Sequence, residues 1–424
     1  MSDSDETSAA TQFGILLIPS FWGFCTWMVW LALYSARLVA WYPSNPVATI
    51  AFIGVAACFL GSMIIFRRPY RDLAARQLRS HPTRKPLAMP ARATLLALHG
   101  IGLLGVALYV RDMARALGGW QQFFASLLYA SQLIRLTLEE TTSFGVQLSY
   151  VGWVAVGLSV CFVRRRQVSS WFLVFSIVQG AANILFMDRT RPIWIGFTTA
   201  LVALSVSESF SARKLVRNAT WGLIGCAVCF AAIAIWIGKT PEEGAFGNSP
   251  LPLSLQYVYS YGTAGFAYFN EIVARLTPTE VGAQRVLYPL FKLLARLSLT
   301  TTPPPQVNDI YWVPFPINVG TFLEPWYRDG GILLATIGVL AQSVGQDFLG
   351  LLLLRNGRPL ARFAWSNLCF ASFIAFFTPK FNNLPFWLFV GLGTAGLAAD
   401  AIRHRIDKRL ASASVAPEGP TRKV

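Results

Sequence analysis

Residues that could bind a phosphate or move a proton gather outside the apolar runs of this sequence. The densest group lies in the run 318–331, and its candidates are Asn318, Thr321, Glu324, Tyr327, Arg328 and Asp329. Arginine matches phosphate oxygens with two parallel N–H groups, and a carboxylate can accept the proton of an attacking hydroxyl. The set suits glycosyl transfer from a lipid diphosphate, because cations stabilise the charge that builds on the departing diphosphate.

Two carboxylates of this run, Glu324 and Asp329, are the catalytic candidates, and Asp309 and Glu271 are further candidates for the base. Asp329 precedes a Gly-Gly pair and an apolar run. It is therefore equally placed to cap the first turn of a helix. The catalytic and capping roles can coexist.

Several cations are expected at the same membrane face. Arg189 and Arg191 bracket a tight turn between two apolar runs, and we expect them to contact the diphosphate together with Arg328. The guanidinium group favours this role because its planar fork fits phosphate oxygens. Further candidates for substrate binding are Arg135, Arg285 and Lys292.

Each of the remaining candidates has a simpler structural interpretation that the sequence leaves open. Asn318 and Thr321 could close a turn by bonding to the backbone. Trp326 and Tyr327 could belong to the aromatic belt at the membrane surface. No metal or cofactor is expected, because the external segments carry no histidine and no closely spaced pair of aspartates that would coordinate a divalent cation.

Composition identifies the elements that must position these residues. The chain has 424 residues, of which 54% are hydrophobic and 13% charged, and its mean hydropathy is +0.49. These values are typical of an all-α polytopic membrane protein and exclude a soluble core. The net charge of +16 does not indicate nucleic acid, because the basic residues concentrate in alternate short loops, as they do on the cytoplasmic side of membrane proteins.

Apolar runs long enough to cross a bilayer recur along the chain and predict about ten spans. Their approximate limits are Phe13 to Tyr34, Val47 to Phe66, Ala93 to Val110, Phe144 to Val163, Trp171 to Met187, Pro192 to Ser207, Thr220 to Ile237, Gly331 to Leu354, Phe363 to Phe377 and Pro385 to Ala399. Eight arginines and lysines between Arg67 and Arg92 place that connection, and with it both chain ends, in the cytoplasm.

This topology divides the chain into five segments. A cytoplasmic tail covers 1–12, spans one to seven cover 13–237, a long external loop covers 238–330, spans eight to ten cover 331–399, and a second cytoplasmic tail covers 400–424. Few spans carry an ionisable group, whereas a transporter would place such groups near the membrane midplane. His99 and Asp347 are interpreted as hydrogen-bonded groups between helices.

The long loop is predicted to contain two amphipathic helices and an extended connection. The segment from Ser254 to Leu276 carries aromatics at helical spacing, which could be a platform for sugar rings or part of the aromatic belt. The segment from Glu280 to Leu299 has a cationic edge that could hold pyrophosphate or lie at the membrane surface. Three consecutive prolines favour an extended chain between Thr300 and Pro316.

The closing motif of the loop resembles that of a known family. Asn318-Val-Gly-Thr321, followed by Pro325-Trp-Tyr327-Arg-Asp329-Gly-Gly331 and an apolar span, is similar to the signature of the bacterial oligosaccharide repeat-unit polymerases, the O-antigen polymerase family. The segments Leu253 to Glu271 and Asp188 to Arg191 resemble two other elements of that family. Gly320 and Gly330 depart from it, since a tyrosine and a phenylalanine are usual there.

The resemblance implies a GT-C-like membrane glycosyltransferase of the bacterial inner membrane, with a periplasmic site. Such enzymes polymerise undecaprenyl-diphosphate-linked oligosaccharides and work with a flippase and a chain-length regulator. One alternative is an O-antigen ligase, a family that carries a histidine in its large external loop. The histidines of this chain, His81, His99 and His404, all lie elsewhere. A lipid-linked oligosaccharide transporter is the alternative from another class.

Overall fold

The computed structural model describes most of the chain. The described residues are 3–79, 88–130, 133–134, 137, 143–186, 188, 190–207, 211, 213, 217, 225, 249–276, 278, 282–304 and 309–414, and within these the side chains of 3–7, 253–254, 257, 400–401, 403–405 and 407–414 are not described. The predicted seventh span, from Thr220 to Ile237, and the candidates Arg135 and Arg189 lie outside the described residues, Gly225 excepted.

The described chain is helical apart from one short hairpin. Its elements are α1 (Asp3–Leu16), α2 (Pro19–Ala36), α3 (Pro46–Arg79), α4 (Met89–Ala116), α5 (Trp120–Tyr129), α7 (Phe144–Arg164), α8 (Trp171–Ala182), the 3₁₀ helix η1 (Asn183–Phe186), α9 (Thr190–Ser205), α11 (Leu253–Arg275), α12 (Tyr288–Arg296), β1 (Tyr311–Trp312), β2 (Pro316–Ile317), α13 (Leu323–Asn356), α14 (Pro359–Phe373) and α15 (Leu384–Ser414). The strands pair antiparallel, with Tyr311 opposite Ile317.

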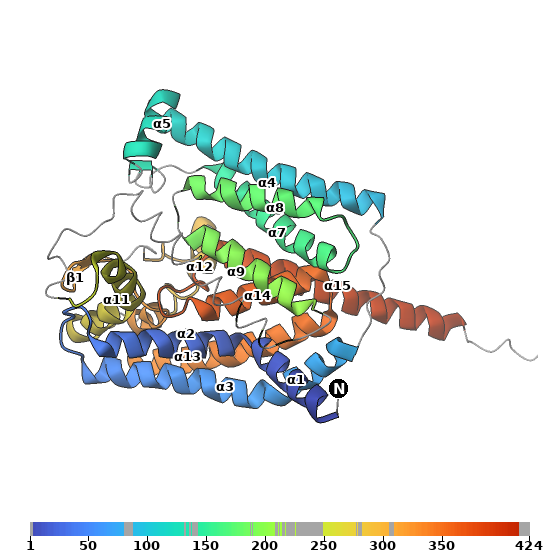
Figure 1. The fold of residues 1–424 in the computed structure, drawn as a ribbon, viewed down its shortest axis with the longest axis horizontal. Helices are drawn as coiled ribbons and strands as arrows, with labels where there is room; N and C mark the ends of the chain where they lie inside the picture. Colours follow the sequence, from blue (N-terminus) through green and yellow to red (C-terminus); the bar gives the residue numbers. More distant parts are fainter. Residues whose placement is uncertain are drawn as a thin grey trace, which may run out of the picture.

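The prediction of an all-α membrane protein is confirmed at this level. Among the described residues four helices, α3, α4, α7 and α13, are long and apolar enough to cross a membrane, and α1 with α2 forms a fifth if that bent pair is one span. Ten spans and the GT-C-like fold stay predictions. In Figure 1 the helices lie along the molecule, with α5, α11 and β1 toward one end and the N-terminus and the end of α15 toward the other.

The first predicted span is not one straight helix. It bends by 75° between Leu16 and Pro19, where the proline supplies no backbone N–H for a continuous helix. The Asp347 carboxylate accepts hydrogen bonds from the Ser20 backbone N–H at 2.9 Å and from the Ser62 hydroxyl at 2.5 Å. Asp347 is therefore the hydrogen-bonded group between helices that the sequence predicted. It also provides an acceptor for one of the backbone N–H groups in the first turn of α2 that have no partner within the helix.

Helix α13 begins eight residues before the predicted span, and this difference shapes the site. Its helical pattern starts at Leu323 and is interrupted at Gly330 and Gly331. Gly331 has φ 68° and ψ −162°, a conformation essentially restricted to glycine. The break allows the Trp326 ring to pack on Gly338, where an added Cβ would lie 2.3 Å from a ring carbon. The residues 323–329 therefore form a separate helical segment folded against the long part of α13.

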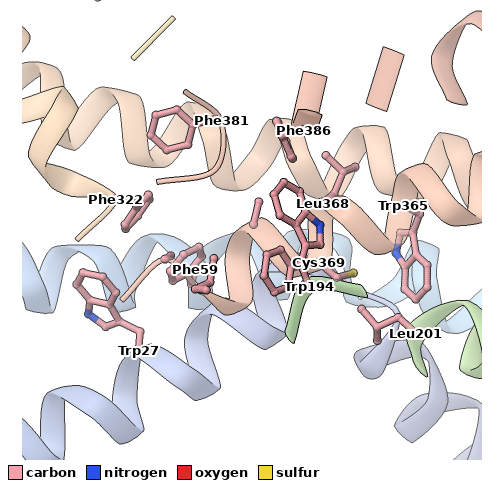
Figure 2. Close-up of a cluster of buried hydrophobic side chains, with 14 of the residues drawn as sticks. Trp27, Phe59, Trp194, Leu201, Phe322, Trp365, Leu368, Cys369, Phe381 and Phe386 are labelled. Atoms are coloured by element: carbon pink, nitrogen blue, oxygen red, sulfur yellow. The ribbon is translucent and has the colours of Figure 1, made fainter. Parts of the chain in front are cut away.

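Aromatic side chains fill the core between the helices (Figure 2), where Trp27 of α2 and Phe59 of α3 meet Phe322 from the turn before α13. Helix α11 contributes to the same core, because its Phe266 packs on Trp27 with ring centroids 4.9 Å apart. The described aromatics of α11 are mostly buried, including Tyr259, Phe266, Tyr268 and Phe269. Both interpretations of this face, a sugar platform and an aromatic belt, are wrong for these side chains.

Polar groups fix α11 against the end of α2 and the connection that follows it. The Tyr259 hydroxyl donates to the Leu33 carbonyl at 2.6 Å and accepts from the Leu38 N–H at 3.0 Å. The Asn270 amide donates to the Pro43 carbonyl at 2.9 Å. These contacts join residues more than 200 positions apart in the chain, so they could not be inferred from local spacing. They hold Tyr268, on the same helix, in a defined position.

Candidate functional site

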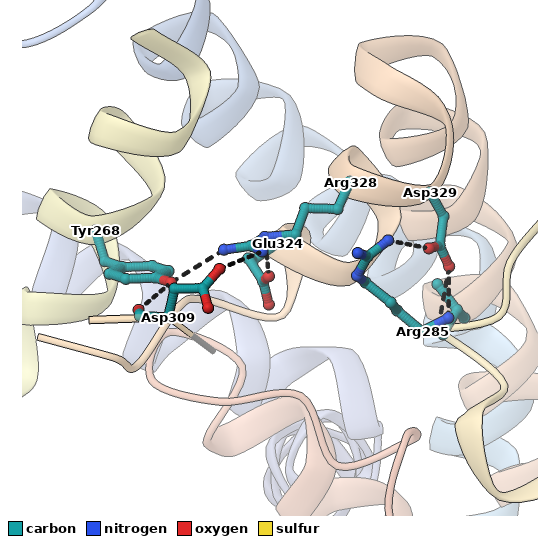
Figure 3. Close-up of polar contacts among 7 residues, drawn as sticks. Tyr268, Arg285, Asp309, Glu324, Arg328 and Asp329 are labelled. Atoms are coloured by element: carbon teal, nitrogen blue, oxygen red, sulfur yellow. Dashed lines mark hydrogen bonds and ion pairs between the residues drawn. The ribbon is translucent and has the colours of Figure 1, made fainter. Parts of the chain in front are cut away.

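A partly buried arginine, Arg328, stands at the centre of the residues that the closing motif brings together. We call Tyr268, Asp309, Glu324 and Arg328 the Arg328 cluster (Figure 3). The Arg328 Nε lies 2.5 Å from Glu324 Oε1, one helical turn earlier, and its Nη2 donates to the Tyr268 hydroxyl at 3.0 Å. Its Nη1 is 3.9 Å from the exposed Asp309 carboxylate. The Arg328 guanidinium thus connects the start of α13 with α11 and with the residues just before β1.

The first segment of α13 positions both members of the ion pair. Residues 324 and 328 are four apart, so the side chains share one face of a helix. The Glu324 side chain is 3% exposed and that of Arg328 is 11% exposed. A buried carboxylate and a guanidinium stabilise each other's charged form, and removing one partner leaves the other charge uncompensated. The charge of Glu324 therefore depends on Arg328 for its compensation.

Tyr268 connects the pair to the hairpin. Its hydroxyl accepts from Arg328 and donates to the Asp309 backbone carbonyl at 2.9 Å, and its ring lies edge-on to that of Tyr311. Burial raises the pKa of the Tyr268 phenol well above its ordinary value, although Arg328 opposes the shift. The phenol stays protonated and can serve as a hydrogen-bond donor.

Gly320 provides the space that this arrangement needs. A Cβ at this position would lie 2.9 Å from Glu324 Cβ and 3.2 Å from a ring carbon of Tyr268. A larger side chain here would displace one of the two. In the family that the closing motif resembles, a tyrosine is usual at this position. In this chain Gly320 leaves that space free, and Tyr268 of α11 lies beside Glu324.

Asp329 has a different set of partners from Glu324. Its Oδ2 accepts from the backbone N–H groups of Arg285 at 2.8 Å and Val286 at 3.2 Å, and its Oδ1 accepts from Arg285 Nη1 at 3.2 Å. Figure 3 shows the Arg285 side chain turned toward this carboxylate. Asp329 therefore accepts hydrogen bonds from the segment before α12. It does not have the helix-capping role that the sequence suggested.

A second group of charges, which we call the Arg191 cluster, contains Tyr150, Asp188, Arg191 and Lys380. Arg191 is 6% exposed, donates to the Ser149 and Tyr150 hydroxyls at 3.3 and 3.1 Å, and lies 3.7 Å from the Asp188 carboxylate. The Phe186 ring lies under its guanidinium, 3.9 Å from the centroid. The attraction between a cation and the face of an aromatic ring is stronger when the pair is removed from water.

The connection between α14 and α15 reaches both clusters. Lys380 lies over the Trp194 ring at 5.2 Å in the Arg191 cluster. The next residue, Phe381, packs on Trp326 with centroids 5.8 Å apart, within the helical segment that carries Arg328. Because the two residues are adjacent, this loop places the two clusters at the same end of the helices.

The structure brings some candidates together and separates others. Glu324 and Arg328 share one cluster, Asp329 and Arg285 form a second pair, and Arg191 belongs to the Arg191 cluster. Lys292 lies apart, exposed on α12, with its ammonium 5.4 Å from the Tyr288 ring centroid. Helix α12 has no buried residue.

The three uncharged candidates lie beside these clusters without forming a second polar centre. Thr321 is fully buried and its hydroxyl has no hydrogen-bond partner, so it does not close a turn through its side chain. Tyr327 packs edge-on against Phe269 inside the protein, which contradicts the belt interpretation. Asn318 is half-buried in the connection after β2.

Sequence reasoning missed two residues of the site, Tyr268 and Lys380. In the sequence Tyr268 is one of several aromatics in the segment from Ser254 to Leu276, and Lys380 is a single cation in the connection before the last predicted span. The hydrogen-bond partners of Tyr268 lie 41 and 60 residues away, and the ring that Lys380 contacts belongs to a still more distant segment, so no local pattern reveals them. Within the described part of the chain, no three histidine, cysteine or acidic side chains are grouped so that they could hold a metal ion.

No protein-family model matches the chain, and no curated protein or solved structure matches it significantly.

Proposed function

We propose that this protein is a membrane glycosyltransferase that polymerises lipid-diphosphate-linked oligosaccharide repeat units. The observation that carries the proposal is the buried Glu324 carboxylate, 2.5 Å from the Arg328 guanidinium, at the head of a helix apolar enough to span a membrane. The pair stands where the closing motif resembles that of repeat-unit polymerases. The fold of the proposed enzyme is GT-C-like.

The roles of the residues follow from their environments. Glu324 is the proposed base, which takes the proton of the attacking sugar hydroxyl. Asp329 is the proposed positioning residue, because its two oxygens are occupied by Arg285 and Val286. Arg191 is the proposed contact for the diphosphate, and a buried arginine near the membrane face stabilises the leaving group as its charge develops. Arg189 and Arg135 stay candidates for the same role.

The proposed reaction takes place at the periplasmic face of the bacterial inner membrane, with both chain ends in the cytoplasm. A hydroxyl of one lipid-linked unit attacks the reducing-end sugar carbon of the growing chain, and undecaprenyl diphosphate leaves. The partners are a flippase, which supplies the units, and a chain-length regulator.

Deleting the gene tests this proposal directly. In a strain whose surface polysaccharide is resolved on gels, we expect lipid A core bearing one repeat unit and no ladder, and a plasmid copy should restore the ladder. Loss of even the single repeat would contradict the proposal and indicate a ligase or a transporter.

One observation keeps the transporter as the second candidate. The first predicted span is broken by 75° and a buried carboxylate, Asp347, meets the start of α2. Discontinuous helices with buried charges are typical of transport sites. Repeat units that accumulate on the cytoplasmic side of the membrane in the deletion strain would favour this function.

A further inference from the structure

Lys380 is a buried ammonium group that the proposed mechanism does not use. It lies in the connection between α14 and α15, and only 8% of its surface is exposed. Its Nζ stands over the Trp194 ring. Among the residues that the structure describes, no carboxylate forms an ion pair with it. A lysine buried without a partner is costly, because the charged form loses its hydration.

The described neighbours of Lys380 carry too little negative charge to compensate for it. The neighbouring Arg191 is a second buried cation, 6% exposed. The carboxylate that faces both, Asp188, lies 3.7 Å from Arg191 and is 47% exposed. Among the residues that the structure describes, the other titratable groups around them are the phenols of Tyr150 on α7 and Tyr109 on α4. The described part of the Arg191 cluster thus holds two positive charges and one negative charge.

Electrostatics within the cluster point in the same direction. Burial, together with the smaller effect of the positive charge of Arg191, lowers the pKa of Lys380 to about 8, although the Asp188 carboxylate opposes the shift. Desolvation would raise the pKa of Asp188, but Arg191, Lys380 and Thr190 hold it below the ordinary value. The carboxylate is therefore ionised already, and a second anion would stabilise the ammonium.

We propose that Lys380 and Arg191 together bind a phosphoryl anion of a lipid headgroup, with Lys380 as a binding residue of this site. The planar guanidinium of Arg191 can donate two parallel hydrogen bonds to phosphate oxygens, and the Lys380 ammonium adds a compact positive charge beside it. The aromatic rings of Phe186 and Trp194 exclude water from one side of the two cations. The identification of the headgroup as the diphosphate of the sugar donor rests on the proposed function. The binding of a phosphoryl anion does not.

Binding of inorganic pyrophosphate to the purified full-length protein tests the proposal. The protein is held in nanodiscs of phosphatidylcholine, and the dissociation constant is measured by calorimetry at pH 7. Lys380→Met removes the charge while keeping a similar volume, and we expect it to weaken binding by about 10-fold to 100-fold, the value of one charge-assisted hydrogen bond. The matched control is Arg111→Met, which removes an exposed cation of α4 that lies outside the cluster.

A pH series separates direct binding from a general loss of structure. Between pH 7 and 9 the wild-type affinity should fall, because deprotonated Lys380 no longer attracts an anion, by at most about 10-fold per pH unit. Lys380→Arg stays charged in this range and should bind without that fall. Asp188 stays ionised, and phenols ordinarily titrate near pH 10, so neither produces the effect. Wild-type affinity in Lys380→Met, or the same pH dependence in Lys380→Arg, would overturn the proposal.

Two further arms identify the source of the phosphoryl group and separate the inference from the proposed function. Competition by undecaprenyl diphosphate identifies the sugar carrier, whereas competition by phosphatidylglycerol identifies an ordinary phospholipid, and either result supports the anion site. If pyrophosphate binding requires Lys380 but the deletion strain still makes full-length polymer, the inference stands and the proposed function fails. If the polymer is lost but Lys380→Met binds pyrophosphate normally, the proposed function stands and the inference fails.

Discussion

Glu324 and Asp329 are both buried carboxylates of one short helical segment, yet their partners give them different expected roles. Glu324 is paired with the Arg328 guanidinium, which also donates to the Tyr268 hydroxyl, whereas Asp329 accepts two backbone N–H groups as well as the Arg285 side chain. A carboxylate occupied by backbone donors holds a loop in place. A carboxylate paired with an arginine beside a substrate site can exchange that partner for a substrate hydroxyl.

Conservative amide substitutions should separate these roles. Glu324→Gln removes the proposed base, and we expect the initial rate of polymer formation to fall by about 10²-fold to 10⁴-fold. Asp329→Asn keeps a carbonyl oxygen that can accept from Arg285 and Val286, so part of the rate should remain. The rates are measured on membranes that contain equal amounts of inserted protein. A Glu324→Gln protein with the wild-type rate would remove Glu324 as the base.

At the scale of elements, the break in α13 is the feature on which the site depends. Residues 323–329 carry Glu324, Arg328 and Asp329, and they are redirected relative to the rest of the helix at Gly330 and Gly331. A continuous helix would carry Trp326 away from Gly338 and separate Arg328 from Tyr268. The Gly-Gly pair is therefore a structural requirement of the Arg328 cluster.

Gly331→Ala should destabilise the protein. The φ of 68° with ψ of −162° is unfavourable for any side chain, at a cost of about 1–3 kcal/mol. Gly345→Ala is the matched control in the same helix, because an added Cβ there meets no atom within 4 Å, and alanine favours a helix by about 1 kcal/mol. Thermal unfolding in detergent measures both. Equal melting temperatures for Gly331→Ala and wild type would show that the break is not needed.

The sequence predicted the elements better than their surroundings. Apolar runs located α3, α4 and α7 because spans need about 20 apolar residues, and the aromatic periodicity located α11. The bend before Pro19 was missed, since the run from Phe13 to Tyr34 is long enough for a straight span.

The candidate site was predicted only in part for a related reason. Periodicity says that one face of α11 is aromatic but not what packs on it, and that face proved to be core. Glu324 and Arg328 were found because they share a motif, whereas Lys380 meets Asp188 and Arg191 across a large separation in the chain. Spacing along a sequence cannot reveal such pairs.

The orientation of the whole molecule is the remaining condition for a periplasmic site. Basic residues concentrate toward the end of α3, and α3 runs away from the end where α11 and β1 lie (Figure 1). The positive-inside rule therefore predicts that the hairpin faces the periplasm and the start of α4 faces the cytoplasm. The proposed function needs this arrangement, because lipid-linked repeat units are polymerised outside.

Single cysteines can establish the orientation. In a chain whose six native cysteines are replaced, Trp312→Cys lies in the hairpin, and Met89→Cys lies at the start of α4. Their native side chains are 65% and 75% exposed. A membrane-impermeant maleimide should label Trp312→Cys in spheroplasts, and Met89→Cys only after the membrane is broken. The reverse pattern would place the Arg328 cluster toward the cytoplasm, where a polymerase of periplasmic units could not reach its substrate.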